Sequence, residues 1–515
     1  MAKIVSMVSR LTGEIRKNGI ANTYYKVKEK RAKTLALKDY ESRRLSVLPT
    51  AKELQAQREK IFTKDITFSI VVPTYHTPEL FLRQMVESVL GQTFCRVELC
   101  IADGSSDDSV EKIVREYQKK DGRICYERLS ENKGISENTN AGLKLATGEY
   151  IGLLDHDDIL ELHALYEMRM ALEKNPQADV LYTDEDKVSF DLTTYFDPHY
   201  KPDFNPDLLR SNNYICHFLV MKRELLEQVG GFREEYDGAQ DFDLVLRLTE
   251  AANCVVHIPK VLYHWRCHDA STAANPLSKL YAYEAGKRAV ESHLKRCGES
   301  GVVNDTRFYG FYQTNYQIPE NYSADLVIFS CNGVNPKKIL NNFSSDLRRQ
   351  NAGNVIYYDN GFNKFVIISN EQDIKGKVLI FAEADLENVS ADALKQLAVN
   401  CLRPGIGMAG GRILSKKGEL LYGRMEPDEN GRLVYADAGL PKGFTGYFHK
   451  AILQQNTEGV SHRLFAIRID LFKGWEPKAT ESAEELMLQL CSYVKKSGYR
   501  IAYVPIATAN KKRES

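Results

Sequence analysis

The stretch GEYIGLLDHDDIL, at residues 148–160, ends an apolar run with three acids, Asp155, Asp157 and Asp158. Two carboxylates spaced D-x-D in an open loop suit Mg²⁺ or Mn²⁺, because these hard cations prefer oxygen ligands and are often shared with substrate phosphates. A cation there would neutralise the charge of a departing diphosphate. The residues also allow a plainer interpretation, in which Asp158 caps a helix over 162–172 and the other acids are solvated.

Three further loops follow predicted strands and carry groups able to hold a nucleotide. VVPTYHTPE at 71–79 ends in a turn that could hold a base, and IADGSSDDS at 101–109 places Asp103 where a carboxylate could accept hydrogen bonds from a base or ribose. NKGISENTNAG at 132–142 offers Lys133 and a glycine for close approach of a diphosphate. Each loop alone is explained as an ordinary turn, but four such strand ends in one sheet favour a shared binding site.

These loops belong to an alternation of short apolar strands and helices that begins near residue 66. Strands that are apolar throughout, separated by helices, predict an α/β fold with a Rossmann-like, mostly parallel sheet and helices on both faces. In such sheets ligands bind beyond the carboxyl ends of the strands. The acids after IGLL are therefore expected at a binding edge.

The bulk composition is that of a soluble globular chain. It has 515 residues, of which 43% are hydrophobic and 27% charged, so two or three domains are expected. The longest apolar runs fall well short of the roughly 18 residues of a membrane helix, and no signal-peptide pattern is visible. Ten cysteines without a C-x-x-C pair fit a reducing compartment, so we expect a cytoplasmic protein.

The charges are unevenly distributed although the chain is neutral overall. Residues 1–60 contain fifteen Lys or Arg and six Asp or Glu, a net charge of +9, which leaves −9 for the remainder. Two interpretations of this helical extension stay open: it packs on the body as a solvated extension, or its basic stretch at 26–33 rests on anionic lipid. Nucleic acid is not an expected partner, because the body is acidic and the basic stretch matches no nucleic-acid-binding motif.

The second half of the chain repeats the order of segments in the first. GEYIGLLDHDDILELHALYEMRMAL at 148–172 resembles GKVLIFAEADLENVSADALKQLAV at 376–399, and FLVMKRELL resembles LFAIRIDLF. We therefore expect two tandem copies of one fold. The expected boundaries are a basic helical extension over 1–65, a first copy over 66–300, a linker over 301–322 and a second copy over 323–515.

Taken in order, the motifs resemble those of family 2 glycosyltransferases with the A-type fold (GT-A). The similarity covers about residues 66–272 and is carried by SIVVPTYHTPELFLRQMVESVLGQTF, ELCIADGSSDDS, NKGIS, GEYIGLLDHDD and GAQDFDLVLR. The resemblance implies that the first copy is the catalytic domain. It also implies a UDP- or dTDP-linked sugar donor, Mg²⁺ or Mn²⁺ at the D-x-D, and inversion at the anomeric carbon.

The resemblance assigns roles to individual residues. Asp155 and Asp157 match the metal-binding D-x-D, and Asp241 in QDFD matches the general base, with Gln240 in place of the commoner glutamate. The positions that match donor-binding residues are Pro73, Thr74, Tyr75, Asp103, Lys133, Gly134 and Asn140.

The implied chemistry is a direct displacement. Asp241 would accept the proton of an acceptor hydroxyl while that oxygen attacks the anomeric carbon; an acid that caps the following helix is the structural alternative. YHWRCHDAST at 263–272 is similar to a family segment beside the acceptor, so Trp265, His268 and Gln240 are candidates for acceptor or phosphate binding. For Trp265 and His268 a structural role, with no contact to the acceptor, is an equally good explanation.

The second copy departs from the catalytic pattern. It has Glu383 and Asp385, two acids able to bind a cation, where the first has the D-x-D, but Ala483 stands in the place of Asp241. We expect a degenerate, non-catalytic domain that holds the acceptor glycan, packs on the catalytic copy or pairs chains into a homo-oligomer.

The expected function is that of a hexosyl- or rhamnosyltransferase that acts on a glycan or lipid-linked acceptor in bacterial cell-surface or cell-wall polysaccharide synthesis, peripheral on the inner face of the membrane. Two alternatives stay open. A sugar nucleotidyltransferase normally carries a Gly- and Arg-rich phosphate loop where this chain has PTYHTPE. A non-catalytic glycan-binding or scaffold protein explains the second copy well, but it does not require a D-x-D together with Asp241.

Overall fold

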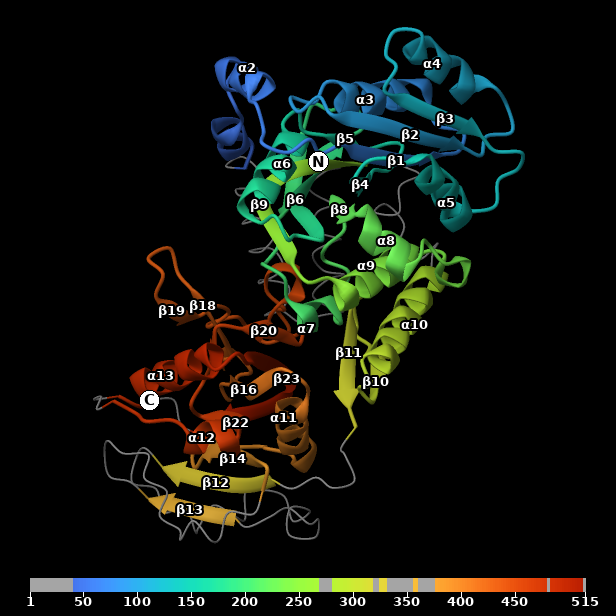
Figure 1. Cartoon of the computed structure of the whole chain (residues 1–515). Coiled ribbons are helices and arrows are strands. Elements are labelled where there is room, and N and C mark those ends of the chain that lie inside the picture. The colour runs from blue at the N-terminus through green and yellow to red at the C-terminus, as the bar shows by residue number, and fades with distance from the viewer. Residues whose placement is uncertain are drawn as a thin grey trace, which may run out of the picture. The chain divides into compact units, whose positions relative to one another are not determined.

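The computed structural model describes residues 40–267, 280–317, 324–330, 355–359, 376–478 and 482–512 (Figure 1). The chain divides into two compact units, each built from several segments. The first comprises Met1–Phe204, Asn213–Cys297 and Arg307–Gly310, and the second comprises Asn205–Asn212, Gly298–Thr306 and Phe311–Ser515. An excursion over 205–212 therefore belongs to the second unit although the chain on either side of it belongs to the first.

The first unit alternates strands and helices around a nine-stranded sheet. Its strands are β1 (Phe68–Thr74), β2 (Val97–Asp103), β3 (Ile124–Arg128), β4 (Tyr150–Leu153), β5 (Ile159–Leu160), β6 (Val180–Ser189), β7 (Tyr195–His199), β8 (Leu219–Lys222) and β9 (Val255–Cys267). Its helices include α2 (Ala51–Glu59), α3 (Glu79–Leu90), α4 (Ser109–Gln118), α5 (Ile135–Leu145), α6 (Ala164–Lys174), α8 (Arg223–Val229), α9 (Gln240–Ala251) and α10 (Leu280–Arg296).

The sheet is mixed: β1, β2, β3, β4, β6 and β9 share one direction, as expected for a mostly parallel sheet, and β5, β7 and β8 run the opposite way. The strands follow the order β3-β2-β1-β4-β8-β6-β9-β5, with β7 paired to β6. Strands β1, β2, β3 and β4 run parallel to one another, but β8 is antiparallel to both β4 and β6. The apolar residues of β8 predict that this strand is buried, but they do not predict its direction. The direction depends on the path of the chain between β7 and β8.

Helices cover both faces of the parallel part of the sheet. All seven residues of β1 are buried. Phe68, Ile70 and Val72 point into one core with side chains of α3, α4 and α6. On the other face, Gly142 of α5 lies so close that an added Cβ would be 2.8 Å from Val71 Cγ1. This packing brings the carboxyl ends of β1, β2 and β4 to one edge, where Thr74 is the register partner of Asp103.

The second unit contains a further nine-stranded sheet. Its principal strands are β12 (Ala324–Ser330), β13 (Val355–Asp359), β14 (Val378–Glu383), β15 (Leu386–Glu387), β16 (Ile406–Leu414), β22 (Leu464–Arg468) and β23 (Arg500–Lys511), with β17 (Leu420–Tyr422) and β20 (Gln455–Thr457) at its margins. Other elements are α7 (Pro206–Leu209), β10 (Gly301–Asp305), β11 (Tyr312–Tyr316), α11 (Ala391–Leu402), β18 (Arg424–Pro427), β19 (Leu433–Tyr435), β21 (Gly459–Val460), α12 (Ile469–Lys473) and α13 (Ala483–Lys496).

The strand order of this second sheet is β13-β12-β14-β22-β16-β23-β15. The strands β13, β12 and β14 are parallel, β22 is antiparallel to β14 and β16, and β16 is parallel to β23. The path from β2 to β5 in the first unit has the same order and the same senses of pairing.

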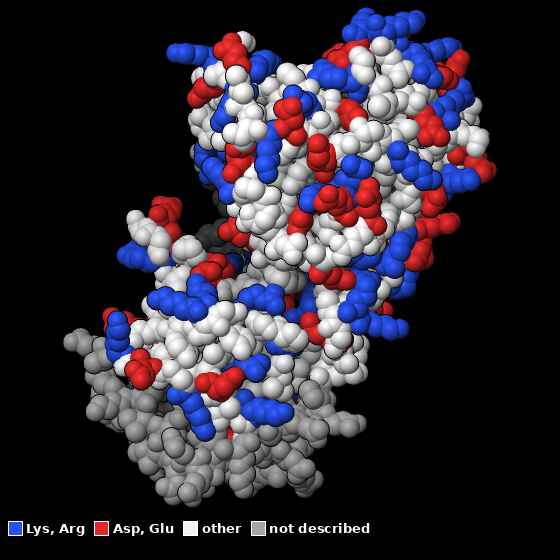
Figure 2. Space-filling view, viewed as in Figure 1, with Lys and Arg blue, Asp and Glu red and all other residues white. Residues whose placement is uncertain are grey.

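The described part of the N-terminal extension is helical over residues 40–47 and in α2. Tyr40 is buried, and its hydroxyl donates to Asp186 Oδ2 at 2.5 Å. The basic stretch at 26–33 lies outside the described residues. Within those that are described, no helix has the length and apolar character needed to cross a membrane. On the face shown in Figure 2, Lys and Arg side chains are interspersed with Asp and Glu.

Candidate active site

The ends of β1 and β2 are joined around a fully buried carboxylate. Asp103 Oδ1 accepts hydrogen bonds from Thr74 Oγ1 at 3.1 Å and from Ser105 N and Oγ at 3.0 and 2.6 Å. Tyr126 donates to Oδ2 at 2.9 Å. A carboxylate with two oxygens has about four acceptor sites, so Asp103 holds the two loops together and keeps capacity on Oδ2.

The turn after β1 reaches the acid loop through a hydrogen bond. Pro73 is buried at the end of the strand, whereas Tyr75 is 48% exposed and packs edge-on against His76. Thr77 Oγ1 lies 3.0 Å from His156 Nδ1. The predicted base-binding turn and the D-x-D loop are therefore neighbours.

The three acids of the loop have different environments. Asp158 is buried, accepts from Arg266 N at 2.7 Å and from the Tyr263 hydroxyl, and does not cap α6. Burial, together with the charges of Asp157 and Asp155, raises its pKa well above the ordinary value. In contrast, Asp155 is 55% exposed. Asp158 is a structural acid, and Asp155 and Asp157 are left as the groups that could meet a cation.

A histidine stands beside Asp155. His217 Nε2 is 3.7 Å from Asp155 Oδ2, and its ring stacks on Tyr263 with the centroids 4.8 Å apart. Burial alone would lower the pKa of His217, but Glu185 and the charges of Asp155 and Asp158 outweigh this effect and raise it to about 9. The surrounding protein atoms desolvate the Asp155 carboxylate and raise its pKa, and the charges of Asp157 and Asp241 act in the same direction against that of His217. This excess of negative charge is suited to a divalent cation.

The proposed base lies in the same cluster. Asp241 is half-buried in the first turn of α9, where Oδ2 accepts from Asn213 Nδ2 at 3.0 Å and Oδ1 from Phe242 N at 2.8 Å. The Cys216 thiol hydrogen-bonds the same carboxylate; burial first, and then Asp241, raises the pKa of that thiol. Asp241 and Asp155 are linked through one short segment, because Asn213 bonds Asp241 and His217, four residues further on, lies beside Asp155.

Sequence reasoning missed the residues that connect these acids, namely Asn213, His217, Glu185 and Lys201. The Lys201 ammonium is fully buried and donates to Glu185 Oε2 at 3.3 Å and to the carbonyl of Ile215 at 3.0 Å. A signal was present in TDEDK at 183–187, since a strand that carries consecutive charges without an exposed face implies buried ion pairs.

The loop before α5 carries the predicted donor-binding residues Lys133 and Gly134. Gly134 has φ = +94°, a conformation that favours glycine. Lys133 is 59% exposed and pairs with Glu131 at 3.3 Å. Asn140 Nδ2 donates to the carbonyl of Phe232 at 2.9 Å, and its Oδ1 accepts from Phe232 N at 2.8 Å. Asn140 therefore holds the loop that leads into α9.

Of the three acceptor candidates, Trp265 and Gln240 lie within the described residues. Trp265, on β9, is half-buried with its ring centroid 6.0 Å from that of His217. Gln240 Oε1 accepts from Gly238 N at 2.8 Å and so closes the turn before α9. His268 lies outside the described residues.

In the second unit, the acid that corresponds to Asp155 forms an ion pair with an arginine. Register pairing puts Ala382 opposite Leu464, and the next residue, Glu383, forms an ion pair with Arg463. The Arg463 guanidinium is therefore adjacent to Glu383 where His217 is adjacent to Asp155. Ala483 opens α13 without a carboxylate.

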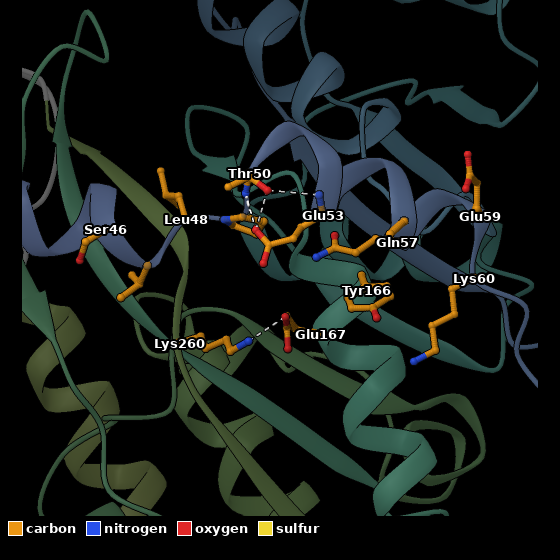
Figure 3. Close-up of a pocket in the computed structure, with 13 residues that line it drawn as sticks. Ser46, Leu48, Thr50, Glu53, Gln57, Glu59, Lys60, Tyr166, Glu167 and Lys260 are labelled. Atoms are coloured by element: carbon orange, nitrogen blue, oxygen red, sulfur yellow. Dashed lines mark hydrogen bonds and ion pairs between the residues drawn. The ribbon is translucent and has the colours of Figure 1, made fainter.

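A separate cavity of about 910 Å³ is lined by the N-terminal extension, α6 and β9 (Figure 3). Lys260 and Glu167 form an ion pair of 2.7 Å on its wall. Its remaining lining residues are Ser46, Val47, Leu48, Pro49, Thr50, Glu53, Ala56, Gln57, Glu59, Lys60 and Tyr166. Helix α2 borders this cavity and has no buried residue. Among residues 40–65 of the extension, Tyr40 is the one that is buried.

Comparison with known proteins places the chain among glycosyltransferases. Residues 69–230 match Glycosyl transferase family 2. The O-antigen biosynthesis protein RfbC of Myxococcus xanthus is 32% identical over 382 residues, which are 69% of this chain and 30% of that protein. An uncharacterized protein of Sinorhizobium fredii is 31% identical over 479 residues, which are 85% of this chain and 52% of that protein.

The chain thus spans about half or less of the length of these two relatives. An uncharacterized glycosyltransferase of Rickettsia typhi is 31% identical over 231 residues, which are 42% of this chain and 69% of that protein. The family expected from the motifs is confirmed: the chain belongs to glycosyl transferase family 2.

Proposed function

We propose that the first unit transfers a sugar from a nucleotide-sugar donor to a glycan or lipid-linked acceptor, with inversion at the anomeric carbon. The observation that carries this proposal is the cluster of Asp155, Asp157 and Asp241. Asp155 and Asp157 are a pair of acids suited to bind a cation, and Asp241 is a separate acid able to take a proton. The name of the Myxococcus xanthus relative supports a role in bacterial cell-surface polysaccharide synthesis.

Asp155 and Asp157 would hold Mg²⁺ or Mn²⁺. The fit rests on the exposure of Asp155 and on the oxygen-only donor set that Asp155 and Asp157 offer. When bound, the cation supplies charge stabilisation to the departing diphosphate.

The donor would lie along the strand ends. The turn Pro73–Thr74–Tyr75 and Asp103 are suited to the nucleoside, and Lys133 with Gly134 to the diphosphate of a UDP- or dTDP-linked sugar. Asn140, whose amide is bonded to Phe232, acts on the donor indirectly by shaping the neighbouring loop.

Asp241 would take the proton from the acceptor hydroxyl as that oxygen bonds to the anomeric carbon. The bond from this carbon to the diphosphate breaks on the opposite side, which inverts the anomeric configuration. Trp265, beside His217, offers an aromatic face to a sugar ring. Gln240 and His268 remain candidates at the acceptor or phosphate side.

The second unit is proposed to be a degenerate copy of the first. The shared strand order supports a common fold, and two differences argue against catalysis there: Ala483 in place of Asp241, and an arginine paired to Glu383. We also propose that the basic stretch at 26–33 rests on anionic lipid at the inner face of the membrane, where lipid-linked acceptors are assembled.

The test is an assay of the full chain against a panel of nucleotide sugars with Mn²⁺ or Mg²⁺, in the presence of membrane extract. We expect release of nucleoside diphosphate from one donor, lost on chelation and reduced at least about a hundredfold in Asp241→Asn, since a general base contributes roughly 10²–10⁴-fold. Glu235→Gln, an exposed acid near α9, serves as the control and is expected to retain the activity. Release that Asp241→Asn does not diminish would refute the assigned base, and no release from any donor would favour a glycan-binding scaffold.

A further inference from the structure

Residues 205–217 form one continuous segment that is divided between the two units. Residues 205–212 belong to the second unit, and the chain from Asn213 onward belongs to the first. Within the first unit, Asn213 and Cys216 bond Asp241, and His217 lies beside Asp155. The segment that borders the candidate base and metal ligands is therefore a direct continuation of a segment held in the second unit.

A buried network of ion pairs fixes residues 205–212 in the second unit. Asp207, on α7, is 1% exposed and accepts from Arg403 at 2.5 and 2.9 Å. Arg403 also donates to Glu299 Oε2 at 2.7 Å, and Arg210 donates to the same carboxylate. Burial would raise the pKa of Asp207, but Arg403 outweighs it and keeps the pKa far below the ordinary value. Breaking such a pair leaves a buried charge unpaired, which costs roughly 3–5 kcal/mol.

Both ends of the excursion are also bonded to main-chain atoms of the second unit. Asn205 Nδ2 donates to the carbonyl of Asn456 and Asn205 Oδ1 accepts from Asn456 N, each at 2.8 Å. Ser211 Oγ donates to the carbonyl of Gln454 at 2.9 Å. The backbone that leads into Asn213 is thus fixed on both sides of α7.

Asn213 itself depends on this backbone. Its Nδ2 must be the atom that faces Asp241, because an ionised carboxylate only accepts hydrogen bonds. Its Oδ1 is buried and has no hydrogen-bond partner in the part of the chain that the structure describes. The amide is therefore held at one end only, and the position of its backbone decides where Nδ2 points.

We propose that the second unit anchors residues 205–212 and thereby sets the position of Asn213, a positioning residue that orients the carboxylate of Asp241. The inference rests on the proposed function, because Asp241 is taken as the base. It assigns to the unit that lacks a base of its own a role in the chemistry of the other unit. Misplacement of a catalytic group by about 1 Å costs on the order of 10²-fold in rate, so a loosened anchor is expected to lower kcat.

The experiment compares Asp207→Asn with Asp437→Asn in the full chain. Asp437 forms a 2.7 Å ion pair with Arg424 and is also nearly buried, but it lies outside the 205–212 network, so it is a matched control for loss of stability in the second unit. We expect Asp207→Asn to lower kcat at least about tenfold, with KM for the donor within about twofold, and Asp437→Asn to leave both near the wild-type values. Equal falls in the two variants would overturn the proposal.

A double variant separates positioning from general damage. If Asp207 acts through Asn213, then Asn213→Ala alone and Asn213→Ala with Asp207→Asn should have the same kcat, because the second change removes nothing further. Independent, multiplying effects would contradict the proposal. Asn205→Ala, which removes a milder anchor, replaces Asp207→Asn if that variant does not fold.

Hydrogen exchange gives a readout that does not need activity. Amides of residues 213–222 should exchange faster in Asp207→Asn than in the wild type, and not in Asp437→Asn. Unchanged exchange in both variants would disprove the anchor even in an active enzyme. Faster exchange in a chain that transfers no sugar would retain the anchor and reject the proposed function instead.

Discussion

The aspartates of the acid loop are neighbours in sequence, but their carboxylates have different surroundings. Asp158 is turned inward, where Tyr263 and Arg266 bond it. Asp155 is turned outward, beside His217. What distinguishes them is the number of protein donors around each carboxylate, because a carboxylate that is already satisfied has little to gain from a cation.

At this scale we predict that Asp155→Asn and Asp157→Asn each weaken Mn²⁺ binding at least about tenfold, which corresponds to about 1.4 kcal/mol. Removing one anionic oxygen ligand from a site with two protein carboxylates is the physical reason. Titration calorimetry with Mn²⁺ and a nucleoside diphosphate measures it.

Asp203→Asn, at a carboxylate that is 98% exposed, is the control and is expected to bind Mn²⁺ as the wild type does. Wild-type affinity in both loop variants would mean that the cation, if it binds, uses other ligands.

Among the elements, the helix at 40–47 and strand β9 are connected by buried polar groups. Tyr40 donates to Asp186, which is 2.5 Å from His264 Nδ1 on β9. His264 Nε2 is 3.2 Å from Glu161, and Arg44 packs over the Tyr195 ring. The same strand β9 supplies Tyr263 and Arg266 to the acid loop. The described part of the extension is thus fastened to the strand that supports the proposed metal site.

A pH dependence follows for this contact. Burial would lower the pKa of His264, but Asp186 and Glu161 raise it from 6.5 to about 9. The stabilisation is therefore complete below about pH 6.5 and is lost as the pH rises through about 9. Asp186, Glu161 and Tyr195 contact the ring, and the charge of His163 also acts on it. Tyr40 and Arg44 contact Asp186 and Glu161, the two acids beside the ring.

Thermal unfolding of the wild type and His264→Gln between pH 6 and 10 tests this expectation. The wild type should be the more stable at pH 6, and its advantage should shrink by up to about 3 kcal/mol towards pH 9–10, at about 1.4 kcal/mol per pKa unit. An advantage that does not change with pH would show that the imidazolium charge contributes nothing.

For the molecule as a whole, the two compact units do not follow the order of the sequence. Arg403 is neutralised by Asp207, which lies 196 residues earlier, and by Glu299. A cut near residue 300 therefore separates a buried arginine from both of its carboxylates. The second unit is complete only with residues 205–212 and 298–306.

A fragment of residues 301–515 is accordingly expected to be unstable on its own, because an unpaired buried charge costs roughly 3–5 kcal/mol. Arg403→Met should make this fragment more stable by removing that charge. Arg424→Met should make it less stable, because Arg424 keeps its partner Asp437 within the fragment. Chemical denaturation of the three fragments measures the order, and a loss of stability in Arg403→Met would contradict the argument.

Much of the candidate site was predictable from local sequence. Apolar runs that end in Thr74, Asp103 and Leu154 identify buried strands, because burial demands apolar side chains wherever the strand lies. The acids that follow those strands then fall at one edge of the sheet, since parallel strands end together. The family, the strand-and-helix alternation and the candidate acids at the strand ends were therefore determined by the sequence itself.

Other features were decided only by the tertiary structure. The direction of β8 depends on the connection that leads to it, and not on the apolar residues it contains. The contact of Asn213 with Asp241, the pairing of Arg463 with Glu383, and the place of Asp207 beside Arg403 join residues that are 28, 80 and 196 positions apart. No local sequence pattern predicts such pairs, because a charged residue is the same letter in the sequence whether water or a buried ion surrounds its side chain.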